Sequence, residues 1–87
     1  MTRQDFLNMT GEFTWDFGMH FFIETSIGNF IWSDPDYNGD NSIKPYNGTC
    51  HEYFQQCGHF GRSKGIHTIG GYCGNDVNIM INLEKEV

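Results

Sequence analysis

The sequence predicts a small α+β domain, in which two hairpins form a mainly antiparallel four-stranded sheet and two short helices cover it. Two observations favour strands over long helices, and a third concerns the core. The 87-residue chain has no alanine and only two leucines, although these residues favour helices most. Aromatic residues make up 16% of the chain, and they supply the dense core that a domain of this size needs. The clearest hydrophobic pattern in the chain also has a period of two.

The length of the chain is that of one domain, which we expect to span residues 1–87. No apolar run approaches the roughly 18 residues of a membrane span. Charged residues occupy the N-terminus, where a signal peptide would be apolar. We therefore expect a cytoplasmic protein that does not bind membranes and whose three cysteines are free thiols.

The first predicted element is a short helix over residues 3 to 10. Thr2 and Asp5 have the spacing of a capping box, in which each side chain satisfies a backbone amide of the other residue. Phe6 and Met9 would lie on one side of such a helix, and Gly11 is expected to end it.

The second element is a long strand over residues 13 to 23. Apolar residues occupy every odd position of this segment and mostly alternate with polar ones. We expect Gly18 to mark a bulge or bend within the strand. Turn-forming residues follow at positions 26 to 29, so residues 29 to 33 are expected to return as the second strand of a hairpin.

A long loop over residues 34 to 48 is expected next, because Asp, Asn, Gly and Pro recur throughout it. Thr49 and Glu52 then form a second capping box, and Gly58 has the position of a C-terminal cap. Between these signals we expect a helix of about two turns, with Cys50 and Cys57 on its apolar face.

The last part of the chain predicts a basic loop followed by a second hairpin. The basic loop covers residues 58 to 65, and a weak strand interrupted by two glycines covers residues 66 to 72. A tight turn at residues 74 to 76 leads to a plainer alternating strand over residues 77 to 83.

One candidate metal site lies in the long loop, where residues 34 to 40 match the first part of a calcium-binding EF-hand loop. The side chains that would ligate Ca²⁺ through oxygen are Asp34, Asp36, Asn38 and Asp40. The match fails at the twelfth position, where Pro45 stands in place of a bidentate glutamate. A solvent-exposed loop of Asx turns is the alternative interpretation.

A second candidate metal site combines Cys57, His59, His67 and Cys73, whose side chains are of the types that ligate Zn²⁺. The spacing counts against it, because the chain contains no C-x2-C or H-x3-H pair. Buried free thiols are the alternative interpretation, since a free cysteine behaves as a small apolar residue.

Charge is distributed unevenly along the chain. Its net charge is −6, and residues 4 to 43 contain seven acidic residues but no Lys or Arg. An acidic surface repels nucleic acid and suits a basic groove on a protein partner. The residues expected to bind such a partner are Asp16, Glu24, Trp32, Asp34, Asp36, Tyr37 and Asp40. A solvated acidic face that keeps the protein soluble is the alternative.

These features predict a small acidic interaction protein without enzymatic activity. One such protein is a phage-encoded inhibitor that blocks the basic surface of a host nucleic-acid-binding defence protein, within the host cytoplasm. The second hypothesis is a metal-binding module that uses the calcium or zinc residues above, and no other cofactor is expected. The third is a small hydrolase with His51, His59 and His67 near Arg62 and Lys64, for which no motif fixes the geometry.

Overall fold

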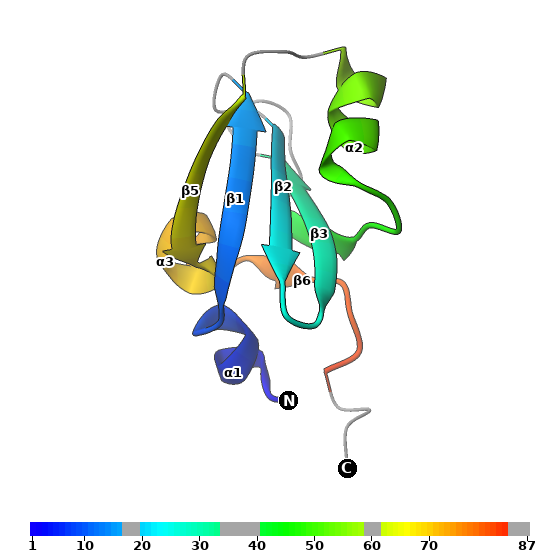
Figure 1. Cartoon of the computed structure of the whole chain (residues 1–87). Coiled ribbons are helices and arrows are strands. Elements are labelled where there is room, and N and C mark those ends of the chain that lie inside the picture. The colour runs from blue at the N-terminus through cyan, green and yellow to red at the C-terminus, as the bar shows by residue number, and fades with distance from the viewer. Residues whose placement is uncertain (17–19, 34–40, 59–61, 84–87) are drawn as a thin grey trace.

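Figure 1 shows a computed structural model of the chain, which describes residues 1–16, 20–33, 41–58 and 62–83. Within these residues the helices are α1 (Arg3–Leu7), α2 (Cys50–Cys57) and α3 (Ile69–Cys73). The strands are β1 (Thr10–Asp16), β2 (His20–Thr25), β3 (Gly28–Ser33), β4 (Ser42–Pro45), β5 (Ser63–Thr68) and β6 (Asn78–Ile79). The mixture of helix and strand agrees with the predicted α+β class, but the sheet has six strands where four were expected.

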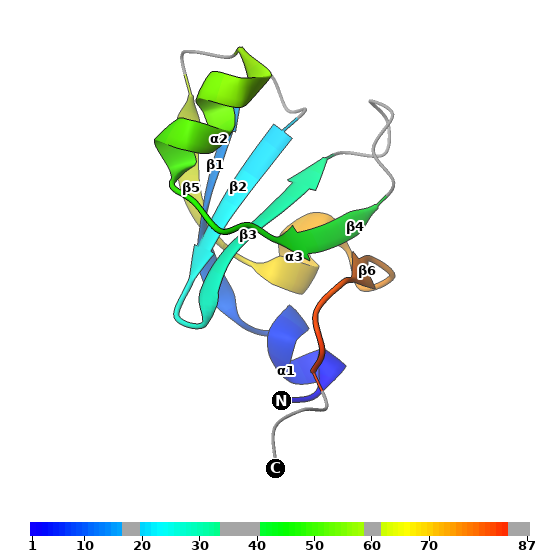
Figure 2. The ribbon, with the colours of Figure 1, turned by 90° about the vertical axis from the view of Figure 1, so that its right-hand side faces the viewer.

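The strands form one sheet in the order β5-β1-β2-β3-β4-β6. Neighbouring strands are antiparallel from β5 to β4, whereas β6 runs parallel to β4. Three short helices flank this sheet, and α2 lies on the opposite side from α1 and α3 (Figure 2). We call the side that faces α1 and α3 the inner face and the side that faces α2 the outer face.

Both predicted capping boxes are present. Thr2 and Asp5 exchange hydrogen bonds at the start of α1, and Thr49 and Glu52 do so at the start of α2. Gly58 ends α2 with a φ of 74°, a left-handed conformation that glycine adopts at little cost. The first helix is shorter than predicted, because the carbonyl of Met9 already accepts a hydrogen bond from the amide of Ile69.

The prediction of one long strand over residues 13 to 23 is wrong, because this segment forms two antiparallel strands. Asp16 at the end of β1 pairs with His20 at the start of β2, and Gly18 lies outside the described residues. Every pair in this register joins two odd or two even positions, as in Phe13 with Ile23. Directly opposed residues share a face of the sheet, so the alternation continues unchanged through the reversal and does not reveal it.

The second half of the chain also differs from the prediction. Only residues 66 to 68 of the strand predicted over residues 66 to 72 are strand, because β5 ends at Thr68 and α3 begins at Ile69. Gly70 lets α3 approach α1, since a Cβ at this position would lie 3.2 Å from the Cβ of Leu7. The predicted strand over residues 77 to 83 is reduced to the two residues of β6, and β4 lies within the predicted long loop.

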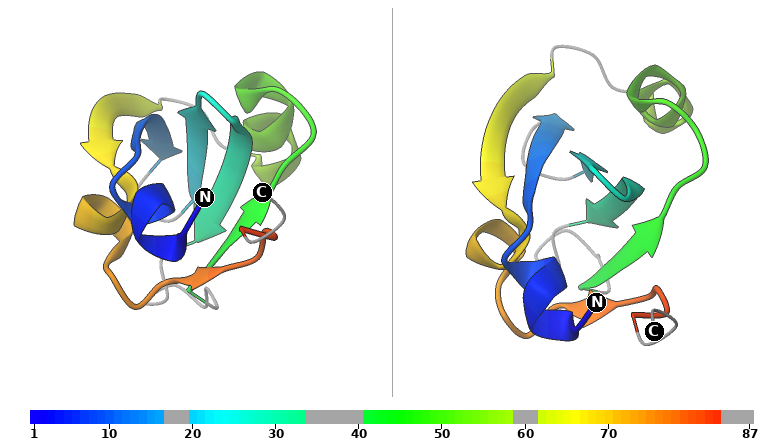
Figure 3. Two further views of the ribbon diagram at one scale, coloured as in Figure 1. Left: turned by 90° about the horizontal axis from the view of Figure 1, so that it is seen from below. Right: turned by 60° about the horizontal axis from the view of Figure 1, so that its bottom comes forward.

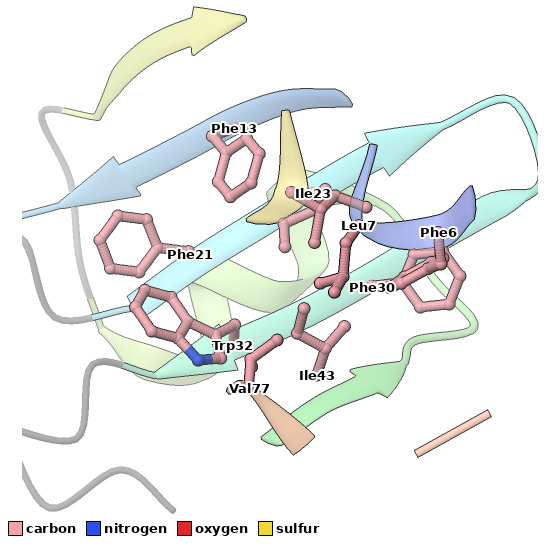
Figure 4. Packing of buried hydrophobic residues seen from close by; sticks show 10 residues of the cluster. Phe6, Leu7, Phe13, Phe21, Ile23, Phe30, Trp32, Ile43 and Val77 are labelled. Atoms are coloured by element: carbon pink, nitrogen blue, oxygen red, sulfur yellow. The ribbon is translucent and has the colours of Figure 1, made fainter. Parts of the chain in front are cut away.

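The main hydrophobic core lies on the inner face, where the sheet curves around it and α1, α3 and β6 close it (Figure 3). Its side chains point toward one another from both the strands and the helices (Figure 4). The buried members are Phe6, Leu7, Phe13, Phe21, Ile23, Phe30, Trp32, Ile43, Ile69 and Val77. Some of the aromatic rings meet edge to face, as Phe6 and Phe30 do with centroids 5.3 Å apart, a favourable arrangement for ring quadrupoles.

A smaller core lies on the outer face beneath α2. Phe22, Tyr53 and Phe54 are buried there, and Cys50 and Cys57 pack against them. The apolar face of α2 predicted from the sequence is therefore the face that contacts the sheet. Among the described residues no helix is both long and apolar enough to cross a membrane.

One side chain connects the two ends of the described chain. The guanidinium of Arg3 donates hydrogen bonds to the carbonyl of Asn75 at 2.8 Å and to that of Val77 at 2.6 Å. This contact holds α1 against the segment that leads into β6.

Candidate functional site

A row of three side chains crosses the outer face of the sheet on β5, β1 and β2. Glu12 lies directly opposite Ile66 on one side and Glu24 on the other. The side chain of Ile66 is 70% exposed, Glu24 is exposed and Glu12 is half-buried. We call Glu12, Glu24 and Ile66 the outer-face patch.

The outer-face patch does not contribute to the stability of the fold. Two like charges directly opposite each other on paired strands are destabilising, and neither carboxylate has an ion pair within the described part of the chain. Exposure of an isoleucine also forgoes the free energy that burial of its side chain would provide. The row thus presents two carboxylates and one apolar side chain together on an accessible part of the sheet.

Two of the residues expected on the acidic surface are not accessible. Asp16 is 2% exposed and Trp32 is 6% exposed. Trp32 belongs to the inner face, where its ring centroid lies 5.0 Å from that of Phe21. The structure therefore does not place Asp16 and Trp32 on an accessible surface, contrary to the expectation, because β1 and β3 direct them into the protein interior.

The remaining residues of that expectation divide into two groups. Glu24 is exposed, as a binding residue requires. Asp34, Asp36, Tyr37 and Asp40 lie outside the described residues, and so does Asn38 of the candidate calcium loop.

The burial of Asp16 has a local explanation. Asp16, His20 and Ser33 occupy opposed positions on β1, β2 and β3, and the hydroxyl of Ser33 lies 3.4 Å from Nδ1 of His20. Tyr53 of α2 reaches this row through interactions of its hydroxyl with Ser33 and Cys57. The contact between α2 and the sheet is otherwise apolar, and this row gives it a polar part. We call this part the seat of α2; its residues are Asp16, His20, Ser33, Tyr53 and Cys57.

Burial changes the titration behaviour of two groups at this contact, Tyr53 and Cys57. Desolvation raises the pKa of the Tyr53 hydroxyl, and the neighbouring Cys57 raises it further. Desolvation also raises the pKa of the Cys57 thiol, although its hydrogen bond with Tyr53 acts in the opposite direction. Both groups are therefore held in their neutral forms, which suits a structural contact better than nucleophilic chemistry.

The candidate zinc residues are not brought together. Cys57 packs against the outer-face core, whereas Cys73 packs against the inner-face core. His67 stacks on Tyr72 with ring centroids 4.5 Å apart, and His59 lies outside the described residues. Within the described ranges, no group of three or more His, Cys, Asp or Glu side chains could hold a metal ion.

Comparisons with models of protein families, with curated proteins and with solved structures find no match to this chain. The candidate site therefore depends on the geometry of its residues alone.

Sequence reasoning missed Glu12 and Ile66 as members of the site. Their neighbourhood depends on the pairing of β1 with β5, and these strands are far apart in the chain. One signal was available in the sequence: Ile66 is the only aliphatic residue among polar and glycine residues in the segment from residue 63 to residue 68.

Proposed function

We propose that this chain is a small non-enzymatic interaction protein, which binds a basic surface of another protein through the outer-face patch. The observation that carries the proposal is the cross-strand row of Ile66, Glu12 and Glu24. It combines an exposed apolar side chain with two opposed carboxylates on a part of the sheet where α2 leaves them accessible.

The chemistry of the row suits an arginine or lysine of the partner. A guanidinium placed between Glu12 and Glu24 would form charge-assisted hydrogen bonds with both carboxylates and remove their mutual repulsion. Ile66, beside Glu12 in the same row, would fill an apolar pocket and exclude water from these bonds.

The charge of the chain supports a partner of a particular class. With a net charge of −6, the protein is attracted to strongly basic surfaces, and many such surfaces bind nucleic acid. We therefore propose a nucleic-acid-binding protein as the partner and inhibition by occupation of its basic surface as the outcome. A phage-encoded inhibitor of a host defence protein is the finer form of this proposal.

The test is partner capture with paired charge reversals. Glu24→Lys should lose at least tenfold in affinity for the captured partner, because it places a cation against the partner's basic surface. Asp76→Lys makes the same charge change at an exposed position outside the row and should retain binding. Affinities are measured by calorimetry on the purified pair.

Two results would contradict the proposal. One is equal loss of binding in Glu24→Lys and Asp76→Lys, which would indicate a response to net charge alone. The other is a partner whose affinity is unchanged by salt, since steering by exposed charges weakens as ionic strength rises. Release of nucleic acid from the partner by the wild-type protein, and not by Glu24→Lys, would support the inhibitor form.

A further inference from the structure

A second feature of the outer face is a pocket between α2 and β5, with β1 beneath it. Its volume is about 420 Å³, and it is open to solvent. The residues that line it are Thr14, Cys50, His51, Arg62 and Lys64. These residues come from distant parts of the sequence; Figure 1 shows β5 and β1 side by side, with α2 beyond β2 and β3.

The pocket is cationic in a strongly acidic chain. The whole sequence has five Lys and Arg residues against eleven Asp and Glu residues, yet Arg62 and Lys64 both line this pocket. Neither is engaged by an acidic side chain within the described ranges. His51 adds a third nitrogen-bearing side chain to the lining.

The positions of Arg62 and Lys64 follow from their contacts with α2 and β1. The guanidinium carbon of Arg62 lies 5.2 Å from the centre of the Phe54 ring, a cation–π contact that leaves its N–H groups available to a ligand. Lys64 lies directly opposite Thr14 in the β1–β5 register. Both positive charges therefore belong to a defined part of the sheet and its helix.

A buried hydroxyl lies in the floor of this pocket. Thr14 is 1% exposed, and its Oγ1 makes no hydrogen bond to any residue that the structure describes. A buried polar group without a hydrogen bond costs free energy, and most such groups in native proteins are satisfied by protein, water or ligand. Because Thr14 lines the pocket, this unsatisfied hydroxyl belongs to a side chain that borders the space a ligand would occupy.

The first turn of α2 adds a further attraction for anions. Cys50 and His51 are the first two residues of this eight-residue helix, and the amide groups at the start of a helix carry partial positive charge. The capping box engages the amides of Thr49 and Glu52, which are not the residues that line the pocket. The helix start and the side-chain cations thus favour the same sign of charge.

We propose that this pocket binds a phosphate-type oxyanion, either inorganic phosphate or the phosphoryl group of a small phosphate ester. Guanidinium, ammonium, imidazole and hydroxyl groups are the donors that recognise tetrahedral oxyanions. A metal cation is disfavoured by Arg62 and Lys64, and a long polyanion is repelled by the acidic remainder of the chain. This site adjoins the outer-face patch, because Thr14 and Lys64 form the next row on the same face of β1 and β5 after Glu12 and Ile66; it does not depend on the function proposed above.

Nuclear magnetic resonance of the labelled full chain provides the test. Sodium phosphate is titrated against sodium chloride at matched ionic strength, while the amide signals are followed. Phosphate should produce saturable shifts centred on Thr14, His51 and Lys64, and chloride should not. Equal shifts with the two salts, or shifts outside the pocket, would overturn the proposal.

Three variants locate the site and one provides a control. Lys64→Gln and Arg62→Gln should each weaken phosphate binding at least fivefold. Lys44→Gln, at an exposed position of β4 outside the pocket, should leave phosphate binding unchanged. Thr14→Val should weaken binding at least twofold while raising the melting temperature, which separates loss of a ligand contact from unfolding. Undiminished binding in Lys64→Gln and Arg62→Gln would contradict the assignment.

Adenosine monophosphate distinguishes the two sources of the phosphoryl group. Tighter binding of this ester than of inorganic phosphate identifies a small phosphate ester as the ligand, because the remaining volume of the pocket then holds its body. Tighter binding of inorganic phosphate identifies the free ion. Absence of binding by both compounds would overturn the proposal.

Discussion

The two faces of the sheet differ in composition and in what they do for the protein. The inner face buries ten residues in one cluster, whereas the outer face buries three. Both buried polar side chains of β1, Thr14 and Asp16, belong to the outer face. Most of the hydrophobic stabilisation therefore comes from the inner face, which leaves the outer face free to carry exposed charge, a pocket and an exposed isoleucine.

Truncation of a side chain on each face should show the largest difference. Phe13→Ala removes a fully buried ring, whose centroid lies 4.8 Å from the centroid of the Tyr72 ring. This variant should lower the free energy of unfolding by about 3–5 kcal/mol. Ile66→Ala removes a 70% exposed side chain and should change it by less than about 0.5 kcal/mol. Urea denaturation measures both values, and a comparable cost for the two variants would refute the distinction between the faces.

Alkaline pH should weaken the outer face through the seat of α2. The pKa values of Cys57 and Tyr53 are raised in the folded protein, so above the ordinary thiol pKa of 9.0 the folded state binds more protons than the unfolded state. The free energy of unfolding therefore falls as pH rises from about 9 through the raised pKa values.

Thermal denaturation between about pH 8 and about pH 11 measures this slope. Cys57→Ala should reduce the fall in melting temperature that begins near pH 9. Cys50→Ala leaves the contact between Tyr53 and Cys57 in place and should show the same fall as the wild-type protein. A melting temperature that is constant over this range would contradict the account of the seat.

The floor of the pocket offers a smaller test of the same comparison. Thr14→Val keeps the shape of the side chain and removes an unpartnered buried hydroxyl, so the free energy of unfolding should rise by about 1 kcal/mol. Thr10→Val makes the same change at an exposed position of β1 and should have little effect. A destabilised Thr14→Val would show that the hydroxyl has a partner in the free protein.

The smallest expected effect concerns the opposed carboxylates. Glu24→Gln removes the repulsion with Glu12 and should raise the free energy of unfolding by roughly 0.2–0.5 kcal/mol at low salt. A double-mutant cycle with Glu12→Gln isolates the pairwise energy. The gain should disappear at high salt, and a gain that persists there would assign the effect to something other than charge.

Features encoded by neighbouring residues could be predicted from the sequence. The capping boxes of Thr2 with Asp5 and Thr49 with Glu52 use side chains three positions apart, and the left-handed cap of α2 uses Gly58 alone. The correct odd-numbered core positions, such as Phe13 and Ile23, also followed from local alternation.

Features that depend on distant pairing could not be predicted. The two residues of β6 become a strand only because β4 lies beside them, and α3 begins where the alternation of β5 would have continued. The pocket shows the same limit. The sequence identified the basic residues of the pocket as candidates for binding or catalysis. It did not identify Thr14, which lies beside them only because β1 pairs with β5.

The contact of Arg3 with the carbonyls of Asn75 and Val77 has a consequence for biosynthesis. Arg3 precedes Asn75 by 72 residues and Val77 by 74 residues, so α1 lacks this anchor while the intervening chain is made. The edge of β1 that pairs with β5 also lacks its partner until residues 63–68 have been made. The nascent chain can therefore form these two contacts only after residues 63–77 have left the ribosome, and until then this edge of β1 and the N-terminal helix lack these partners.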